Sequence, residues 1–230
     1  MTHARTAFIC ADQVDHNGLR AWIRGLQSLV SYWAHRPHDA IRYAQSGRGC
    51  LSDSGTSVVW LDVSEARGWA ALGNVQEARS AIERAEQARE RVHPDDLDQL
   101  GGICTFGRVR QLYYTADTLA WLPSEAATAA NYSLQAVQAY GDTNGPEWAF
   151  GDQAGAHADL SIARIAQGEL EGAAEALAPV LELPPEERIN GVIVSTQRVH
   201  NALRNAALPS RDLQEAIEVF GRTPVAALPR

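Results

Sequence analysis

Apolar residues along most of this chain recur every three or four positions, which is the spacing of one face of an α-helix. A stripe of this kind lies between positions 173 and 181 and ends before two consecutive prolines. No segment alternates polar and apolar residues for long enough to indicate a β-sheet. The pattern therefore predicts an all-α fold. The clearest stripe consists of Ala78, Ala81, Ile82, Ala85 and Ala88.

Glycine turns divide these helices into hairpins. Ala-Leu-Gly73-Asn-Val-Gln-Glu-Ala78 and Ala-Gln-Gly168-Glu-Leu-Glu-Gly-Ala173 share a glycine that is followed, at the same distance, by an alanine. The glycine permits a tight turn between two helices, and the alanine lets their backbones approach closely. Two weaker copies place His35 and Ser124 at the turn, and Ala40 and Ala129 at the alanine position.

This arrangement is typical of tetratricopeptide repeats, although the copies here are spaced more widely than the about 34 residues of a strict repeat. A single hairpin cannot bury its apolar face alone, so hairpins of this type stack side by side. We therefore expect a right-handed, tetratricopeptide-like α-solenoid of four to five hairpins. Since no segment is long or polar enough to act as a linker, one domain over residues 1–230 is expected.

The N-terminal segment has a stripe of its own, formed by Ala4, Ala7, Phe8 and Ala11. Residues 4–13 are interpreted as the second helix of a hairpin whose first helix is absent. Because an uncapped solenoid end exposes apolar surface, we expect another copy of the chain, or upstream sequence, to cover this edge. A homo-oligomer, in its simplest form a homodimer, is the partner that this pattern predicts.

Charge and cysteine content narrow the functional classes. All 20 basic residues are arginine, and 28 acidic residues bring the formal net charge to -8 and the pI to about 5.3. Direct nucleic-acid binding is therefore not expected, because it depends on a basic surface. Three separated cysteines without a disulfide spacing favour a reducing cytoplasm. No apolar run approaches the ~18 residues of a membrane span.

Five segments carry a resemblance to a known family: residues 19–29, 32–37, 105–117, 150–155 and 183–188. They resemble the tetratricopeptide-repeat portion of bacterial helix-turn-helix transcriptional regulators of the Xre type. In that family an N-terminal helix-turn-helix contacts DNA, and the repeats are thought to sense a signal, bind a partner or mediate dimerisation. No helix-turn-helix segment with basic flanks is present here, so the resemblance implies a regulatory or ligand-binding module without DNA binding. The likeness covers nearly the whole chain and is specific at these five segments.

In a tetratricopeptide hairpin the first helix lines the concave face. Turn-relative positions on that helix predict an aromatic groove with one arginine that is suited to a carboxylate or phosphate. The alternative is that the rings are packed between helices as core, which is the more frequent fate of any single aromatic residue at helical spacing. The predicted ligand-binding residues are Trp22, Tyr32, Trp60, Arg67, Gln111, Tyr114 and Trp121.

The segment from Arg108 to Tyr114 combines two arginines with two tyrosines. It either recognises an anionic group or ties neighbouring hairpins through ion pairs with Asp117, Asp152 or Asp159. We favour the ion pairs, because acidic residues are abundant in this chain.

No metal site, cofactor motif or catalytic signature is recognisable. A non-catalytic regulatory or sensor module that binds a small molecule, a peptide or a protein partner is therefore favoured. An enzyme recruited from the regulator family, with Tyr114, Asp117 or His157 transferring a proton, is one alternative. A plain assembly scaffold is the other.

Overall fold

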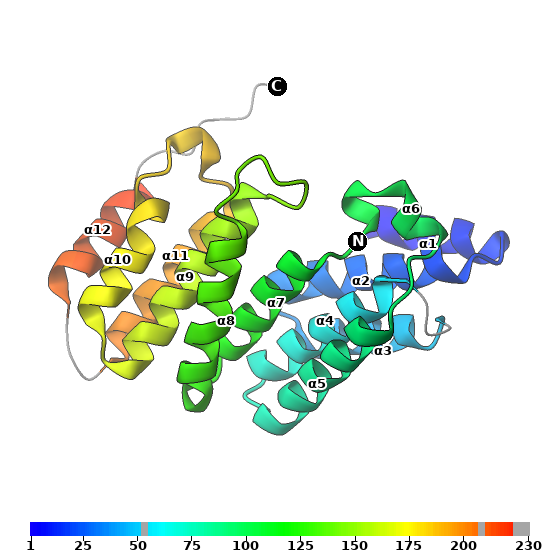
Figure 1. Ribbon diagram of the computed structural model, residues 1–230, viewed down its shortest axis with the longest axis horizontal. Coiled ribbons are helices and arrows are strands. Elements are labelled where there is room, and N and C mark those ends of the chain that lie inside the picture. Colours follow the sequence, from blue (N-terminus) through cyan, green and yellow to red (C-terminus); the bar gives the residue numbers. More distant parts are fainter. Residues whose placement is uncertain (52–54, 207–209, 223–230) are drawn as a thin grey trace.

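The computed structural model describes residues 1–51, 55–206 and 210–222, and those residues form an all-helical protein without a β-strand (Figure 1). The predicted all-α class is confirmed. Residues 52–54, 207–209 and 223–230 of the expected domain lie outside the described residues. The α-helices are α1 (Thr2–Gln13), α2 (Asn17–Trp33), α3 (Pro37–Arg48), α4 (Ser57–Ala71), α5 (Val75–Arg91), α6 (Asp96–Leu100), α7 (Arg108–Ala120), α8 (Ala126–Ala139), α9 (Phe150–Gln167), α10 (Leu170–Leu181), α11 (Asn190–Arg204) and α12 (Arg211–Arg222), and three short 3₁₀ helices are η1 (Gly102–Cys104), η2 (Pro123–Glu125) and η3 (Pro185–Glu187).

Successive helices pack as hairpins. The hairpins are α2 with α3, α4 with α5, α7 with α8 and α9 with α10, whereas α11 touches α12 less closely. Across hairpins, α3 packs on α4 and α8 on α9 as extensively as α9 packs on α10. Helices α2, α4, α7, α9 and α11 also contact one another in that order, so they form one continuous row, which we call the inner helices. Figure 1 shows the hairpins side by side along the long axis, from the blue N-terminal helices to the red α12.

The turns fall where the sequence pattern placed them. Gly73 and Gly168 have φ angles of 73° and 81°, in the left-handed region that glycine adopts without strain. His35, which substitutes for glycine in the first hairpin, also has a positive φ of 55°. Ser124 instead lies within η2. All four alanines that follow the turns have no exposed surface: Ala40, Ala78, Ala129 and Ala173.

The N-terminal helix α1 packs against α2 and buries Ala4 and Ala11. The Arg24 guanidinium of α2 lies 3.7 Å from the centre of the Phe8 ring and holds α1 in place through a cation–π contact. The opposite face of α1 carries exposed residues such as Ile9, which is 57% exposed. Coverage of this edge by a second copy stays a prediction.

Candidate functional site

Side chains on the inner helices form three successive layers along the helix axes. On α7 the order is Tyr114, then Asp117, then Leu119, and on α9 it is Asp152, then Asp159, then Ile162. The first residue of each series lines a pocket with aromatic walls, the second belongs to a buried group of charged side chains, and the third lines a pocket with aliphatic walls. We call these layers the aromatic pocket, the charge cluster and the apolar pocket.

The aromatic pocket has a volume of about 360 Å³ and lies between α2, α4, α7, the start of α9 and the loop that contains η1. This volume is at the small end of the range for small-molecule sites. Its walls are aromatic and aliphatic except for one arginine and one aspartate. The lining residues are Trp22, Leu26, Leu29, Trp60, Ile103, Phe106, Arg110, Tyr114, Ala149 and Asp152.

Four aromatic rings support one another around this pocket. The ring centres of Trp22 and Trp60 are 4.1 Å apart, those of Trp60 and Phe106 are 6.2 Å apart, and those of Phe106 and Tyr114 are 5.3 Å apart. Gly25 makes room for the indole of Trp60, since a Cβ atom at position 25 would lie only 2.8 Å from that ring. These contacts restrict the orientations of the rings, so the aromatic wall is largely formed before any ligand arrives.

The polar part of the aromatic pocket is an ion pair. Arg110 Nε donates to Asp152 Oδ2 at 3.2 Å, and the Tyr140 hydroxyl donates to the same oxygen at 3.3 Å. Burial lowers the pKa of Arg110, but the Asp152 carboxylate together with Tyr114 and Tyr140 outweighs burial and raises that pKa above its ordinary value. The pairing of Arg110 with Asp152 is one that the sequence predicted, whereas Arg108 pairs with Glu86 at 2.6 Å.

The charge cluster is centred on the Asp117 carboxylate. Arg67 Nε on α4 donates to Asp117 Oδ2 at 2.6 Å, and the Tyr32 hydroxyl on α2 donates to the same oxygen at 2.8 Å. Arg198 Nη1 on α11 donates to Asp117 Oδ1 and lies 3.5 Å from Asp159 Oδ1 on α9. One carboxylate thereby connects helices from four hairpins.

The two buried aspartates of this cluster have opposite pKa shifts. Burial alone would raise the pKa of Asp117, but the guanidiniums of Arg67 and Arg198 together lower it to about 2. Burial and the negative charge of Asp117 raise the pKa of Asp159 well above its ordinary value. Asp159 Oδ2 has no hydrogen-bond partner in the described part of the chain. Asp117 is therefore the carboxylate that neutralises the guanidiniums.

Tyr114 links the charge cluster to the aromatic pocket. The guanidinium carbon of Arg67 lies 4.0 Å from the centre of the Tyr32 ring and 4.2 Å from that of Tyr114, so the cation sits against both π faces. Because Tyr114 also lines the aromatic pocket, a ligand that moves this ring disturbs the contact with Arg67.

The structure places six of the seven predicted ligand-binding residues in two of these layers. Trp22, Trp60 and Tyr114 line the aromatic pocket, and Tyr32, Arg67 and Trp121 belong to the charge cluster. The Trp121 indole N–H donates to the Tyr32 hydroxyl at 2.7 Å, and Trp121 is 36% exposed. Arg67, expected to hold the anionic group of a ligand, is 2% exposed and paired with Asp117.

Gln111, the seventh predicted residue, has no exposed surface and accepts a hydrogen bond of 2.7 Å from Arg89 Nε. Arg89 Nη2 also donates to the Phe106 carbonyl at 2.6 Å. These bonds fasten the loop before α7 onto α5. Gln111 thus supports the wall that carries Phe106 and is not itself among the residues that line the aromatic pocket.

Sequence reasoning missed Phe106 as a pocket residue and missed Arg198 altogether. It considered Arg110 for anion recognition or an ion pair, and Asp152 only as an ion-pair partner. Arg198 lies on α11, where no turn signature marks the hairpin. Its signal in the sequence is faint: an arginine on the apolar stripe of a helix, one turn before Ala202. Phe106 comes from the loop before α7, to which hairpin periodicity assigns no position.

The three residues considered for proton transfer do not share one pocket. Tyr114 lines the aromatic pocket, whereas both oxygens of the Asp117 carboxylate are bonded to arginines in the charge cluster. His157 Nδ1 lies 2.9 Å from the Ala176 carbonyl oxygen, and this side chain borders a separate cavity of about 130 Å³. Within the described residues no cluster of histidine, cysteine and acidic side chains is arranged to hold a metal ion.

No protein-family model matches this sequence, and no curated protein is similar enough to it to be matched. Among the described helices, none combines the length and the apolar character that a membrane crossing requires.

Proposed function

We propose that this chain is a non-catalytic regulatory or sensor module, built as a tetratricopeptide-like solenoid, that binds a small molecule in the aromatic pocket. The observation that carries the proposal is the set of four mutually packed rings around a cavity of about 360 Å³ with one ion pair in its wall. Pockets with mostly apolar walls and few fixed polar groups are the usual form of small-molecule sites.

The chemistry of the walls favours a ligand with a flat apolar ring and one anionic group. Aromatic side chains offer their faces and edges to such a ring. Arg110 is only partly buried, with 30% of its side chain exposed, and it bonds to Asp152 through its Nε–H group. A carboxylate or sulfonate is the natural partner for a guanidinium in this position.

A regulatory role is supported by the connection between pocket and charge cluster. A ligand that prefers one position of Tyr114 shifts the contact of this ring with Arg67, and Arg67 in turn holds Asp117 and the helices tied to it. Such a shift requires the ligand to bind the two arrangements with different affinities. The resemblance of the sequence to the repeats of Xre-type regulators points to the same role.

Titration with 8-anilinonaphthalene-1-sulfonate, which carries aromatic rings and one sulfonate, tests the proposal. We expect saturable binding, and we expect Trp22→Ala to weaken it by at least about tenfold because a contact of this size is worth more than about 1.4 kcal/mol. Trp69→Ala is the matched control, since Trp69 lies outside the pocket and bonds to Glu65. Equal affinities of the two variants, with both folded by circular dichroism, would refute the assignment of the pocket.

A further inference from the structure

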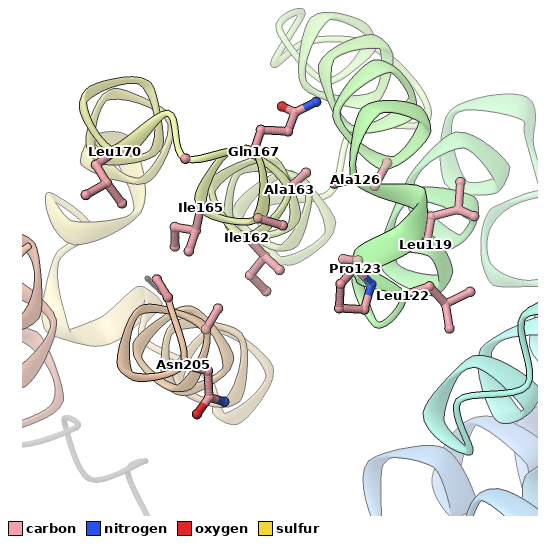
Figure 2. A pocket seen from close by; sticks show the side chains of 16 residues that line it. Leu119, Leu122, Pro123, Ala126, Ile162, Ala163, Ile165, Gln167, Leu170 and Asn205 are labelled. Atoms are coloured by element: carbon pink, nitrogen blue, oxygen red, sulfur yellow. The ribbon is translucent and has the colours of Figure 1, made fainter. Parts of the chain in front are cut away.

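The apolar pocket at the other end of the inner helices is larger than the aromatic pocket, with a volume of about 540 Å³. Figure 2 shows Ile162 and Ile165 of α9 pointing toward the space beside α11, with Pro123 of η2 on the opposite side. Its walls come from α7, η2, α8, α9, the start of α10 and α11. The pocket is thus bordered by helices of three hairpins.

The pocket exists because alanine occupies many of the positions that face it. Ala126 on α8, Ala163 on α9 and Ala202 on α11 all line the cavity, and each extends only a single methyl group from its helix. The ion pairs of Arg198 with Asp117 and Asp159 lie about one turn away on α7, α9 and α11 and hold these helices together there. The walls are therefore fixed by contacts outside the pocket.

The chemistry of the lining sets the kind of ligand. None of the described residues that line the cavity is charged. The only amide side chains are those of Gln167 and Asn205, both exposed and labelled at separate edges of the pocket in Figure 2. Moving a charged group into such a site is costly because no opposite charge compensates it, whereas an apolar body gains from burial.

We propose that the apolar pocket is a second ligand site, independent of the aromatic pocket, and that it takes an uncharged aliphatic molecule of small-molecule size. A single hydroxyl or carbonyl on this molecule reaches the amide of Gln167 or Asn205 at the rim. The volume is within the range of sites that enclose small ligands. The alanine walls accommodate a flexible chain because no ring fixes the shape of the space.

Fluorescence titration with N-phenyl-1-naphthylamine, an uncharged apolar probe, tests this site on the full chain. We expect saturable binding and displacement of the probe by 1-decanol. Decanoate at neutral pH has the same chain length, and we expect it to compete at least about tenfold less well because its carboxylate loses hydration in the pocket.

Ala126→Leu fills the cavity and should weaken probe binding at least about tenfold, and Ala202→Leu does the same from α11 if the first variant fails to fold. Ala127→Leu is the matched control, because Ala127 is exposed on the same helix and does not line the pocket. Trp22→Ala should leave this binding unchanged, which separates it from the test of the aromatic pocket.

Three results would overturn the inference. Equal competition by decanol and decanoate would contradict an uncharged ligand. Unchanged probe affinity in the filled variants would place the probe elsewhere. Self-association that disappears in Ala126→Leu, measured by sedimentation, would show that a second copy of the chain occupies this face.

Discussion

Replacing Asp117 with asparagine removes the only carboxylate that accepts hydrogen bonds from both Arg67 and Arg198 in the described residues. The side chain of Arg67 is 2% exposed and that of Arg198 is 13% exposed, so water cannot take the place of the lost charge. Removing one partner of a buried ion pair typically costs about 3 to 5 kcal/mol. We expect Asp117→Asn to lower the free energy of unfolding by this amount.

The pKa of Asp117 gives an independent and smaller value for this loss of unfolding free energy. A fall from the ordinary 3.8 to about 2 corresponds to about 2 kcal/mol of stability at neutral pH. Because the folded-state pKa is the lower one, this stability is present above about pH 4 and is lost as the pH falls toward 2. The variant should therefore lack that part of the acid-induced loss of stability.

Asp159→Asn is the control within the same cluster. Its carboxylate is equally buried, but its closest cation lies 3.5 Å away and its other oxygen has no partner. Since the pKa of Asp159 is raised, the neutral amide resembles the state that burial already favours. We expect a change of less than about 1 kcal/mol. Urea unfolding followed by circular dichroism at neutral pH measures both variants, and equal losses would refute the central role assigned to Asp117.

Two further predictions concern packing and pH. Gly25→Ala should destabilise the protein by about 1 to 3 kcal/mol, because the added methyl group meets the Trp60 indole. The fluorescence of Trp60 should shift as well, and an unaltered melting curve would contradict this prediction. Burial raises the pKa of Asp62 to about 6 despite Arg48 and Arg84 nearby, so wild-type stability should fall as the pH rises from about 4 through 6. Asp62→Asn should remove this loss, worth up to about 3 kcal/mol, and a gain that is the same at pH 4 and pH 7 would show the reasoning to be wrong.

The helices and their turns were predictable because local patterns determine them. The stripe from Ala78 to Ala88 is buried along α5, and the glycines at positions 73 and 168 adopt the left-handed conformation that the turns require. The hairpin pattern was readable because each unit involves residues near one another in the sequence. Its limits appear at α11, which has no glycine turn before α12.

The candidate site was predictable only in part, since its contacts join residues far apart in the sequence. Trp22, Trp60 and Tyr114 were identified from their positions on the inner helices. The sequence identified Arg67 as an inner residue but not its partner, because hairpin periodicity does not specify which helix supplies the opposite charge. The apolar pocket was not predicted, because an alanine in the sequence does not indicate whether its small side chain is packed against a neighbour or borders a cavity.

The bonds from Tyr32 and Arg198 to Asp117 span 85 and 81 residues of sequence. In a stack of hairpins, contacts otherwise join immediate neighbours, and such proteins tend to melt piecewise from their ends. The shared Asp117 carboxylate at the middle of the row opposes this tendency. Loosening the hairpin of Tyr32 or that of Arg198 takes a hydrogen-bond partner away from this buried carboxylate. The chain should accordingly unfold in a single cooperative transition, and fragments cut between α8 and α9 should each be far less stable than the intact protein.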